Sequence, residues 1–266
     1  MLRAQYFMED PREGRRLSRK VDADRWVTQY LAPWLPTNGR ILEVGCGSGS
    51  LAIAAGLNMP NAEVIGLDLN PDRFSHTLAE LPPNVKLRQG EAGHLPFPAD
   101  TYDLVYSRFL LQYLSDRQGA VREMARVCRP GGRILLQDLD GQLLWHYPED
   151  AQLQAGITHV IAGLEQLGFD PFVGRKLFSL LKSLGLRDIR VSADSYHLYP
   201  GAIDPVNLEL WETKLDIVLP AAAGILGSEV EALALKRRFL EFLRRDDSLT
   251  YSVAFTVDGQ KPPQPL

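Results

Sequence analysis

A tight glycine turn behind a short apolar run is the feature that most constrains this chain. Residues 41–44 read as a buried strand, and they lead directly into Gly45, Cys46, Gly47, Ser48 and Gly49. A helix-like segment follows at residues 50–58. Glycine allows positive φ angles and close approach of a ligand, and the start of a helix presents unpaired N–H groups. The turn therefore predicts a cradle for a nucleotide-like cofactor.

Short apolar runs and helix-like segments alternate along much of the chain. This alternation predicts an α/β fold, with parallel strands joined by right-handed crossovers and helices on both faces of the sheet. We expect strands at residues 41–44, 63–68, 85–88, 102–107, 133–138, 188–193 and 249–257. We expect helices at residues 50–58, after Asn70, at 115–128, 149–167 and 173–184, and in an insert near 206–246 that breaks near 220–227.

An acidic residue narrows the choice of cofactor. Asp68 ends the second predicted strand about twenty residues after the turn, where a carboxylate can accept both hydroxyls of an adenosine ribose. This arrangement fits either NAD or S-adenosylmethionine. The dinucleotide fingerprint is met only in a relaxed form, because Ser50 or Ala52 stands where its third glycine would be. Glu91 follows the third strand, and its carboxylate can accept a hydrogen bond from an adenine amino group.

Further motifs stand in a characteristic order. They are Leu42 to Gly49, Gly66-Leu67-Asp68, Gly90-Glu91-Ala92, Leu95-Pro96-Phe97, Tyr102-Asp103-Leu104-Val105 and Arg129-Pro130-Gly131-Gly132. Together they resemble the class I S-adenosylmethionine-dependent methyltransferases, and in particular the small-molecule branch that includes the ubiquinone and menaquinone methyltransferases. The resemblance implies a Rossmann-like, seven-stranded, mostly parallel sheet in the order 3-2-1-4-5-7-6, with strand 7 antiparallel and a helical cap.

The resemblance also implies S-adenosyl-L-methionine as the cofactor and assigns residues to it. Gly45, Gly47 and Gly49 would line its methionine and ribose part, with Glu43 fixing the loop. Asp68 would bind the ribose hydroxyls. The other residues expected at the cofactor are Cys46 in the turn, Leu69 over the adenine face, Glu91 and Ala92 at the adenine edge, Ser107 at the end of the fourth strand, Tyr6 as a lid and Arg16 as the partner of the methionine carboxylate.

We expect one methyltransferase domain over residues 1–266. Residues 1–39 would form an N-terminal helical lid, residues 40–138 the cofactor-binding core, and residues 139–266 the substrate-side half. The basic cluster Arg12, Arg15, Arg16, Arg19 and Lys20 is typical of a solvated helix face.

The acceptor should lie beyond the carboxyl ends of the strands. Methyl transfer is an in-line displacement from a sulfonium, so the enzyme chiefly orients the acceptor. A base is needed only where the acceptor must lose a proton, and His146 is the candidate because neutral imidazole is available near neutral pH. The residues expected to contact an apolar or aromatic acceptor are Arg108, Phe109, Tyr113, Trp145, Tyr147 and Trp211.

The composition of the chain excludes several kinds of partner. The net charge of −4 argues against a nucleic-acid partner, which needs concentrated basic residues. The two cysteines, Cys46 and Cys128, form no metal-binding pattern, so we expect no metal. No apolar run reaches the length of a membrane span, and the first residues lack the apolar core of a signal peptide, so we expect a cytoplasmic protein.

The predicted function is S-adenosylmethionine-dependent methyl transfer to an O, N or C atom of a small, apolar or aromatic metabolite. A protein methyltransferase and a non-catalytic S-adenosylmethionine-binding module are the alternatives. An NAD-linked oxidoreductase is disfavoured, because Tyr113 is followed four residues later by Arg117 and not by the lysine of a Tyr-x-x-x-Lys pair.

Overall fold

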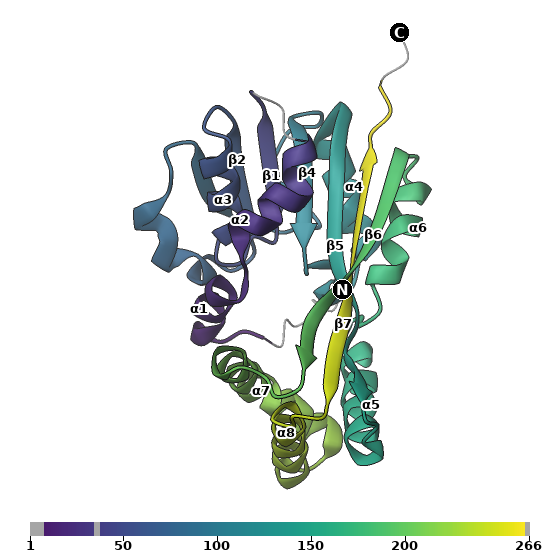
Figure 1. The fold of residues 1–266 in the computed structure, drawn as a ribbon. Helices are drawn as coiled ribbons and strands as arrows, with labels where there is room; N and C mark the ends of the chain where they lie inside the picture. The colour runs from purple at the N-terminus through teal and green to yellow at the C-terminus, as the bar shows by residue number, and fades with distance from the viewer. Residues whose placement is uncertain (1–7, 35–37, 264–266) are drawn as a thin grey trace.

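The computed structural model describes residues 8–34 and 38–263, in which seven strands form one sheet (Figure 1). The strands are β1 (Arg40–Val44), β2 (Glu63–Asp68), β3 (Val85–Gln89), β4 (Tyr102–Arg108), β5 (Cys128–Tyr147), β6 (Arg187–Pro200) and β7 (Leu249–Gln260). Their order is β3-β2-β1-β4-β5-β7-β6, and β7 runs antiparallel to both of its neighbours. The predicted α/β fold class and strand order are confirmed.

Helices cover both faces of the sheet, and others lie beyond one end of it. They are α1 (Pro11–Lys20), α2 (Ala23–Trp26), α3 (Ser50–Asn58), α4 (Arg117–Val127), α5 (Ala151–Gln166), α6 (Leu177–Ser183), α7 (Pro205–Leu226) and α8 (Glu229–Leu243). A π-helical turn at Val27–Leu31 follows α2, and 3₁₀ turns lie at Ala32–Trp34, Pro71–Arg73, Ser75–Glu80, Leu111–Tyr113 and Gly174–Lys176. Within the part of the chain described, every helix is too short or too polar to cross a membrane.

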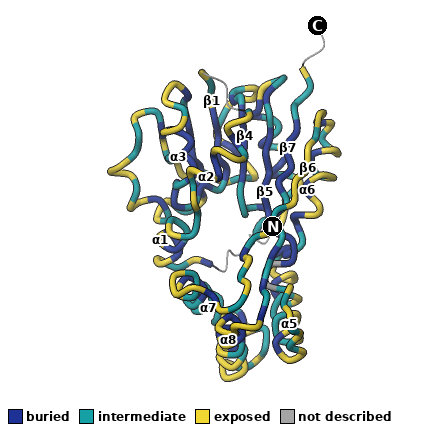
Figure 2. The backbone as a smooth tube through the Cα atoms, viewed as in Figure 1, coloured by how far each residue is buried: buried dark blue, intermediate teal, exposed yellow. Residues whose placement is uncertain are grey.

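The two faces of the sheet carry separate apolar cores. On one face, α4 and α6 pack against the strands through side chains such as Val121, Met124 and Leu181. On the other face, α3 and the turn after α2 contribute Leu51 and Val27. Figure 2 shows the central strands buried along most of their length between these layers. Continuous apolar strands are the pattern expected when helices cover both faces.

Three helices, α5, α7 and α8, pack together beyond the carboxyl ends of the parallel strands, and we call them the cap (Figure 1). Their shared core contains Leu153, Trp211, Phe239 and Leu240. The cap is connected to the sheet by β5, β6 and β7, which are much longer than β1 to β4. Apolar burial at about 25 cal/mol per Å² stabilises such a packed layer.

Several predicted boundaries were wrong. The strand expected at residues 133–138 runs over Cys128–Tyr147, and β7 pairs with it over Arg133–Asp140 and again over Trp145–Tyr147. The helix expected after Asn70 consists of 3₁₀ turns, and the Thr77 hydroxyl donates to the Phe74 carbonyl there. The insert was expected to break near residues 220–227, and it does so at the end of that range. Helix α7 continues through Pro220 and ends at Leu226, before Gly227, whose φ of 71° only glycine adopts readily.

Candidate functional site

A cavity of about 490 Å³ lies at the carboxyl ends of β1, β2 and β4, and we call it the main cavity. The glycine turn, the end of β2 and the segment after β3 form one side of it, and α1 lies on the other. The predicted cofactor residues that line it are Arg16, Glu43, Gly45, Cys46, Gly47, Asp68, Leu69, Glu91 and Ala92. The structure thus brings most of the predicted site together.

The glycine turn approaches its neighbours too closely for larger residues. Gly45, Gly47 and Gly49 have φ angles of 79°, 54° and 78°. A Cβ on Gly45 would lie 2.8 Å from Leu110 Cδ1, and a Cβ on Gly47 would lie 3.1 Å from a Leu17 methyl carbon. The turn is therefore closed on both sides, and its backbone is exposed to the main cavity.

Three donors hold the Asp68 carboxylate beside this turn. The backbone N–H of Gly47 donates to Oδ2 at 2.8 Å, and the N–H of Asn70 donates to Oδ1 at 3.1 Å. Arg73 Nη1 donates to Oδ1 at 2.9 Å, and the same guanidinium pairs with Glu9. Asp68 is buried, so these bonds fix its carboxylate at the end of β2.

Glu43 lies under the turn, in the middle of the sheet. Burial raises the pKa of Glu43 to about 8, although a hydrogen bond from the Tyr106 hydroxyl at 3.1 Å acts in the opposite direction. The carboxyl group therefore keeps its proton at neutral pH, because ionising it in the apolar interior is unfavourable. Glu43 acts here as a neutral hydrogen-bonding group below the cavity.

The first helix, α1, covers the turn. Asp10 caps it by accepting the N–H of Arg12 at 2.8 Å. Arg16 and Glu13 form a buried bidentate pair at 2.6 and 2.7 Å, and both line the main cavity. The prediction that the basic cluster on α1 forms a solvated helix face is therefore wrong for Arg16 and Lys20, which line the main cavity. Tyr6 lies outside the described residues.

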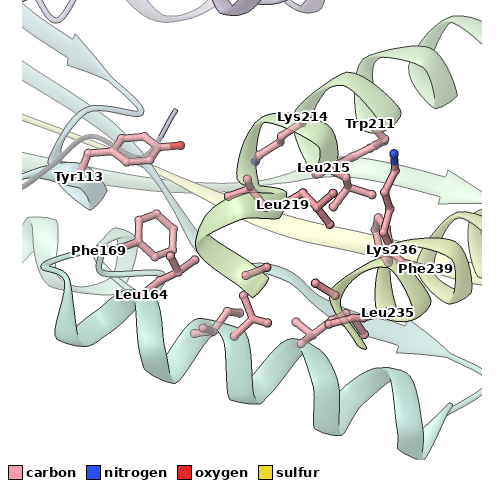
Figure 3. Close-up of a pocket in the computed structure, with 16 residues that line it drawn as sticks. Tyr113, Leu164, Phe169, Trp211, Lys214, Leu215, Leu219, Leu235, Lys236 and Phe239 are labelled. Carbon is pink, nitrogen blue, oxygen red and sulfur yellow. The ribbon is translucent and has the colours of Figure 1, made fainter. Parts of the chain in front are cut away.

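A second, apolar cavity of about 130 Å³ lies inside the cap (Figure 3). Side chains of α5, α7 and α8 form its wall, and we call it the cap cavity. Trp211, a predicted acceptor residue, lines it, whereas Arg108 and Phe109 line the main cavity. Tyr113 and Lys214 belong to the walls of both cavities, so the two cavities meet there.

The remaining predicted residues lie elsewhere. His146 is on β5, where its Nδ1 lies 3.1 Å from the Thr250 hydroxyl and its ring lies 5.0 Å from that of Phe242. Trp145 stacks on Tyr251, and Tyr147 is largely exposed. This placement beside β7 and α8 does not support His146 as a general base, nor Trp145 and Tyr147 as acceptor contacts.

Two predicted cofactor residues, Gly49 and Ser107, are not part of the wall of the main cavity. Gly49 is the N-terminal cap residue of α3, and a Cβ there would lie 2.6 Å from Leu87 Cδ1. Ser107 is buried in β4 and pairs in register with Leu136.

Known proteins match this chain in both sequence and fold. A family described as methyltransferase domain matches residues 42–136. Methyltransferase str2 of Strobilurus tenacellus is 28% identical over 218 residues, which cover 78% of this chain and 76% of that protein. A demethylmenaquinone methyltransferase of Lactiplantibacillus plantarum is 37% identical over 118 residues, 41% of this chain and 49% of that protein. This chain is a class I S-adenosylmethionine-dependent methyltransferase.

A solved structure matches this methyltransferase over more of its length. Phosphoethanolamine N-methyltransferase 2 of Haemonchus contortus, in complex with S-adenosyl-L-methionine, superposes with a TM-score of 0.55 at 17% identity. The match covers 90% of this chain and 52% of that one. The predicted resemblance to the small-molecule branch is confirmed. This chain matches only about half the length of the demethylmenaquinone methyltransferase.

The residues that line the main cavity fit this cofactor. Positive φ angles and close contacts keep side chains out of the turn, so its backbone can meet a ligand directly. Asp68 is already oriented by backbone donors, and Glu43 below it is uncharged at neutral pH.

Sequence reasoning missed several side chains of the main cavity, among them Lys20, Arg73 and Lys214. Helical spacing could have found two of them. Lys20 follows Arg16 by four residues on α1, and Lys214 follows Trp211 by three on α7, so each shares a helix face with a predicted residue. Arg73 follows Asp68 in a segment that was expected to start a helix, and no comparable pattern marks it.

Proposed function

We propose that this methyltransferase transfers a methyl group to an O, N or C atom of a small, apolar or aromatic metabolite. The cap cavity carries the proposal, because aliphatic and aromatic side chains such as Leu164, Phe169 and Leu215 form its wall. It adjoins the main cavity at Tyr113 and Lys214. A small pocket lined in this way binds an apolar group with a few polar contacts at its mouth.

The relatives support a small acceptor. The demethylmenaquinone methyltransferase and the phosphoethanolamine N-methyltransferase are both named for small molecules. The first protein matches this chain over only part of its length, and the second resembles it in fold alone. The evidence for an apolar acceptor is therefore the cap cavity.

We assign the cofactor contacts within the main cavity as follows. Asp68 binds the ribose hydroxyls, Glu91 and Ala92 meet the adenine edge, and Leu69 covers its face. Arg16 binds the methionine carboxylate, since its guanidinium lines the main cavity beside the turn and a guanidinium binds carboxylates by charge-assisted hydrogen bonds. S-adenosylmethionine supplies an electrophilic methyl group when bound.

The chain's own contribution is to hold the acceptor at the meeting point of the two cavities and to exclude water from it. Proximity and orientation of this kind can supply about 7–11 kcal/mol of rate enhancement. No base is assigned, because His146 of β5 is not part of the wall of either cavity and an acceptor without a proton to lose needs none.

The test uses S-adenosylmethionine with a deuterated methyl group. The purified protein is incubated separately with the small-molecule and protein fractions of a cell extract, and mass spectrometry locates the label. We expect label in the small-molecule fraction, and none there with an Asp68→Ala variant. Label confined to protein would favour a protein methyltransferase, and cofactor binding without transfer would favour a non-catalytic module.

A further inference from the structure

Three cations line the main cavity on the side of the cap. They are Lys20 of α1, Arg108 at the end of β4 and Lys214 of α7. Among the residues that the structure describes, no carboxylate lies within ion-pair distance of any of them. Arg108 instead donates to the amide oxygen of Gln137 at 2.9 Å and to the Tyr196 hydroxyl at 3.3 Å.

Aromatic rings hold these cations in place. Lys20 Nζ lies 5.1 Å from the centre of the Tyr196 ring, and Arg108 Cζ lies 4.0 Å from the centre of Phe109. Lys214 Nζ lies 5.0 Å from the centre of the Trp211 ring. Cation–π contacts stabilise the positions of these side chains, but the neutral rings do not neutralise their positive charge.

The nearest acids of the cavity are already engaged. Glu13 is paired with Arg16, and Asp68 is paired with Arg73. Glu43 is uncharged at neutral pH, because burial raises its pKa to about 8. This side of the cavity therefore carries an excess of positive charge, and an anion would be attracted to it.

Burial and the neighbouring charges also set how readily these groups hold a proton. Burial lowers the pKa of Lys20 and of Lys214 well below the usual lysine value, and nearby cations lower both further. The pKa of buried His197 is lowered for the same two reasons, with Lys20 and Lys214 as the largest charges acting on it. Both effects disfavour the charged lysines while no anion is bound, and an anion beside them would favour their protonated forms.

Lys214 also marks where the apolar surface begins. In Figure 3 its nitrogen points from α7 toward Tyr113, and Leu219 and Phe169 lie below that line. The same lysine belongs to the wall of both cavities. A ligand bound here would place an apolar body among the cap helices and a charged group at the junction.

We propose that the methyl acceptor carries a carboxylate on an apolar body, and that Lys214, together with Lys20 and Arg108, binds that carboxylate. The inference rests on the proposed function, because it names the acceptor class of the same site. The methionine carboxylate of the cofactor is a second anion, assigned above to Arg16. The cavity offers more cations than that one group requires.

The test compares two probes of equal size, 4-phenylbutyrate and its neutral amide 4-phenylbutanamide. Calorimetry measures the binding of each to the protein saturated with S-adenosylhomocysteine. We expect the wild-type protein to bind the acid at least about tenfold more tightly than the amide, as charge-assisted hydrogen bonds predict. Lys214→Met should reduce this preference to about twofold or less, and Lys214→Arg should restore it.

Lys236→Met is the matched control. Lys236 lines the cap cavity too, but its ammonium is paired with Asp216, so we expect the preference for the acid to persist. Equal binding of acid and amide, no binding of either probe, or an unchanged preference in Lys214→Met would each overturn the proposal. Loss of S-adenosylhomocysteine binding in Lys214→Met would overturn it as well, because the lysine would then serve the cofactor. Failure of the wild-type protein to bind S-adenosylhomocysteine would instead refute the proposed function.

Discussion

The main cavity and the cap cavity adjoin, yet they are built in different ways. Backbone geometry shapes the main cavity, through the positive φ angles of the turn and the N–H groups that hold Asp68. Side-chain volume shapes the cap cavity, which is lined almost wholly by apolar residues of three helices. The family match covers residues 42–136 and none of these three helices. Cofactor binding and acceptor binding should therefore respond to different mutations.

Asp68→Ala should have the largest effect. The substitution removes the acceptor of the Gly47 N–H and the proposed partner of the ribose hydroxyls. We expect binding of S-adenosylhomocysteine to weaken by about 100-fold or more, roughly 3 kcal/mol, by calorimetry. Asp72→Ala, at an exposed acid in the next turn, is the control and should bind within about twofold of wild type. A loss of only about twofold in Asp68→Ala would remove Asp68 from the site.

Glu43→Gln should change how stability depends on pH. The pKa of Glu43 is about 8 in the folded state and 4.5 as the ordinary value, so the unfolded chain loses this proton first as pH rises. Stability contributed by the neutral group is therefore present at low pH and lost between about pH 4.5 and 8, on the order of a few kcal/mol. Glutamine cannot ionise, so chemical denaturation should show a flatter profile in that window.

Asp138→Asn is the companion to that variant. Burial raises the pKa of Asp138 to about 7, so its window should run from its ordinary value of 3.8 to about 7. For Asp138→Asn we expect the plot of unfolding free energy against pH to flatten only between about pH 3.8 and 7. An unchanged profile in Glu43→Gln would mean that Glu43 is ionised in the folded protein.

Two glycine substitutions test the backbone argument directly. Gly49→Ala places a Cβ at a φ of 78° and 2.6 Å from a Leu87 methyl carbon, so we expect a loss of about 1–2 kcal/mol of unfolding free energy. Gly224→Ala, inside α7, meets nothing within 4 Å and should stabilise by about 0.5–1 kcal/mol. Thermal or urea unfolding distinguishes the two signs. The same sign at both positions would contradict the contrast between turn and cap.

The sequence predicted the cofactor side far better than the cap. The positions of Gly45, Asp68 and Glu91 follow from local rules, because parallel strands end at one edge and their loops must meet there. The contacts made by Lys214 depend on how α7 packs against α1 and α5, and no local pattern encodes that. The position of His146 depends on the same packing. β5 continues past its predicted end, paired with β7, and the imidazole lies beside Thr250 and Phe242, outside the wall of either cavity.

The long strands explain the remaining differences. The fifth strand was expected to end at residue 138 and the residues after it to meet the acceptor, since a ligand of this fold binds beyond the carboxyl ends of the strands. Pairing with β7 provides hydrogen-bond partners for backbone groups of β5 beyond residue 138. The pattern of apolar residues did not indicate that the strand continues so far. The same extension places the cap, and it leaves Trp145 and Tyr147 outside the walls of both cavities.

Ala222→Leu should have the smallest effect on the cofactor and the clearest effect on the cap. Ala222 is buried and lines the cap cavity, so a leucine there fills space without touching the glycine turn. We expect binding of S-adenosylhomocysteine within about twofold of wild type and a change in stability of at most about 1 kcal/mol, while 4-phenylbutyrate binds about tenfold more weakly. Ala223→Leu, one residue later on the same helix and outside the cavity wall, should leave both ligands unaffected. If Ala222→Leu weakened the cofactor as much as the probe, the two cavities would act as one site, and the separation between backbone-built and side-chain-built halves would fail.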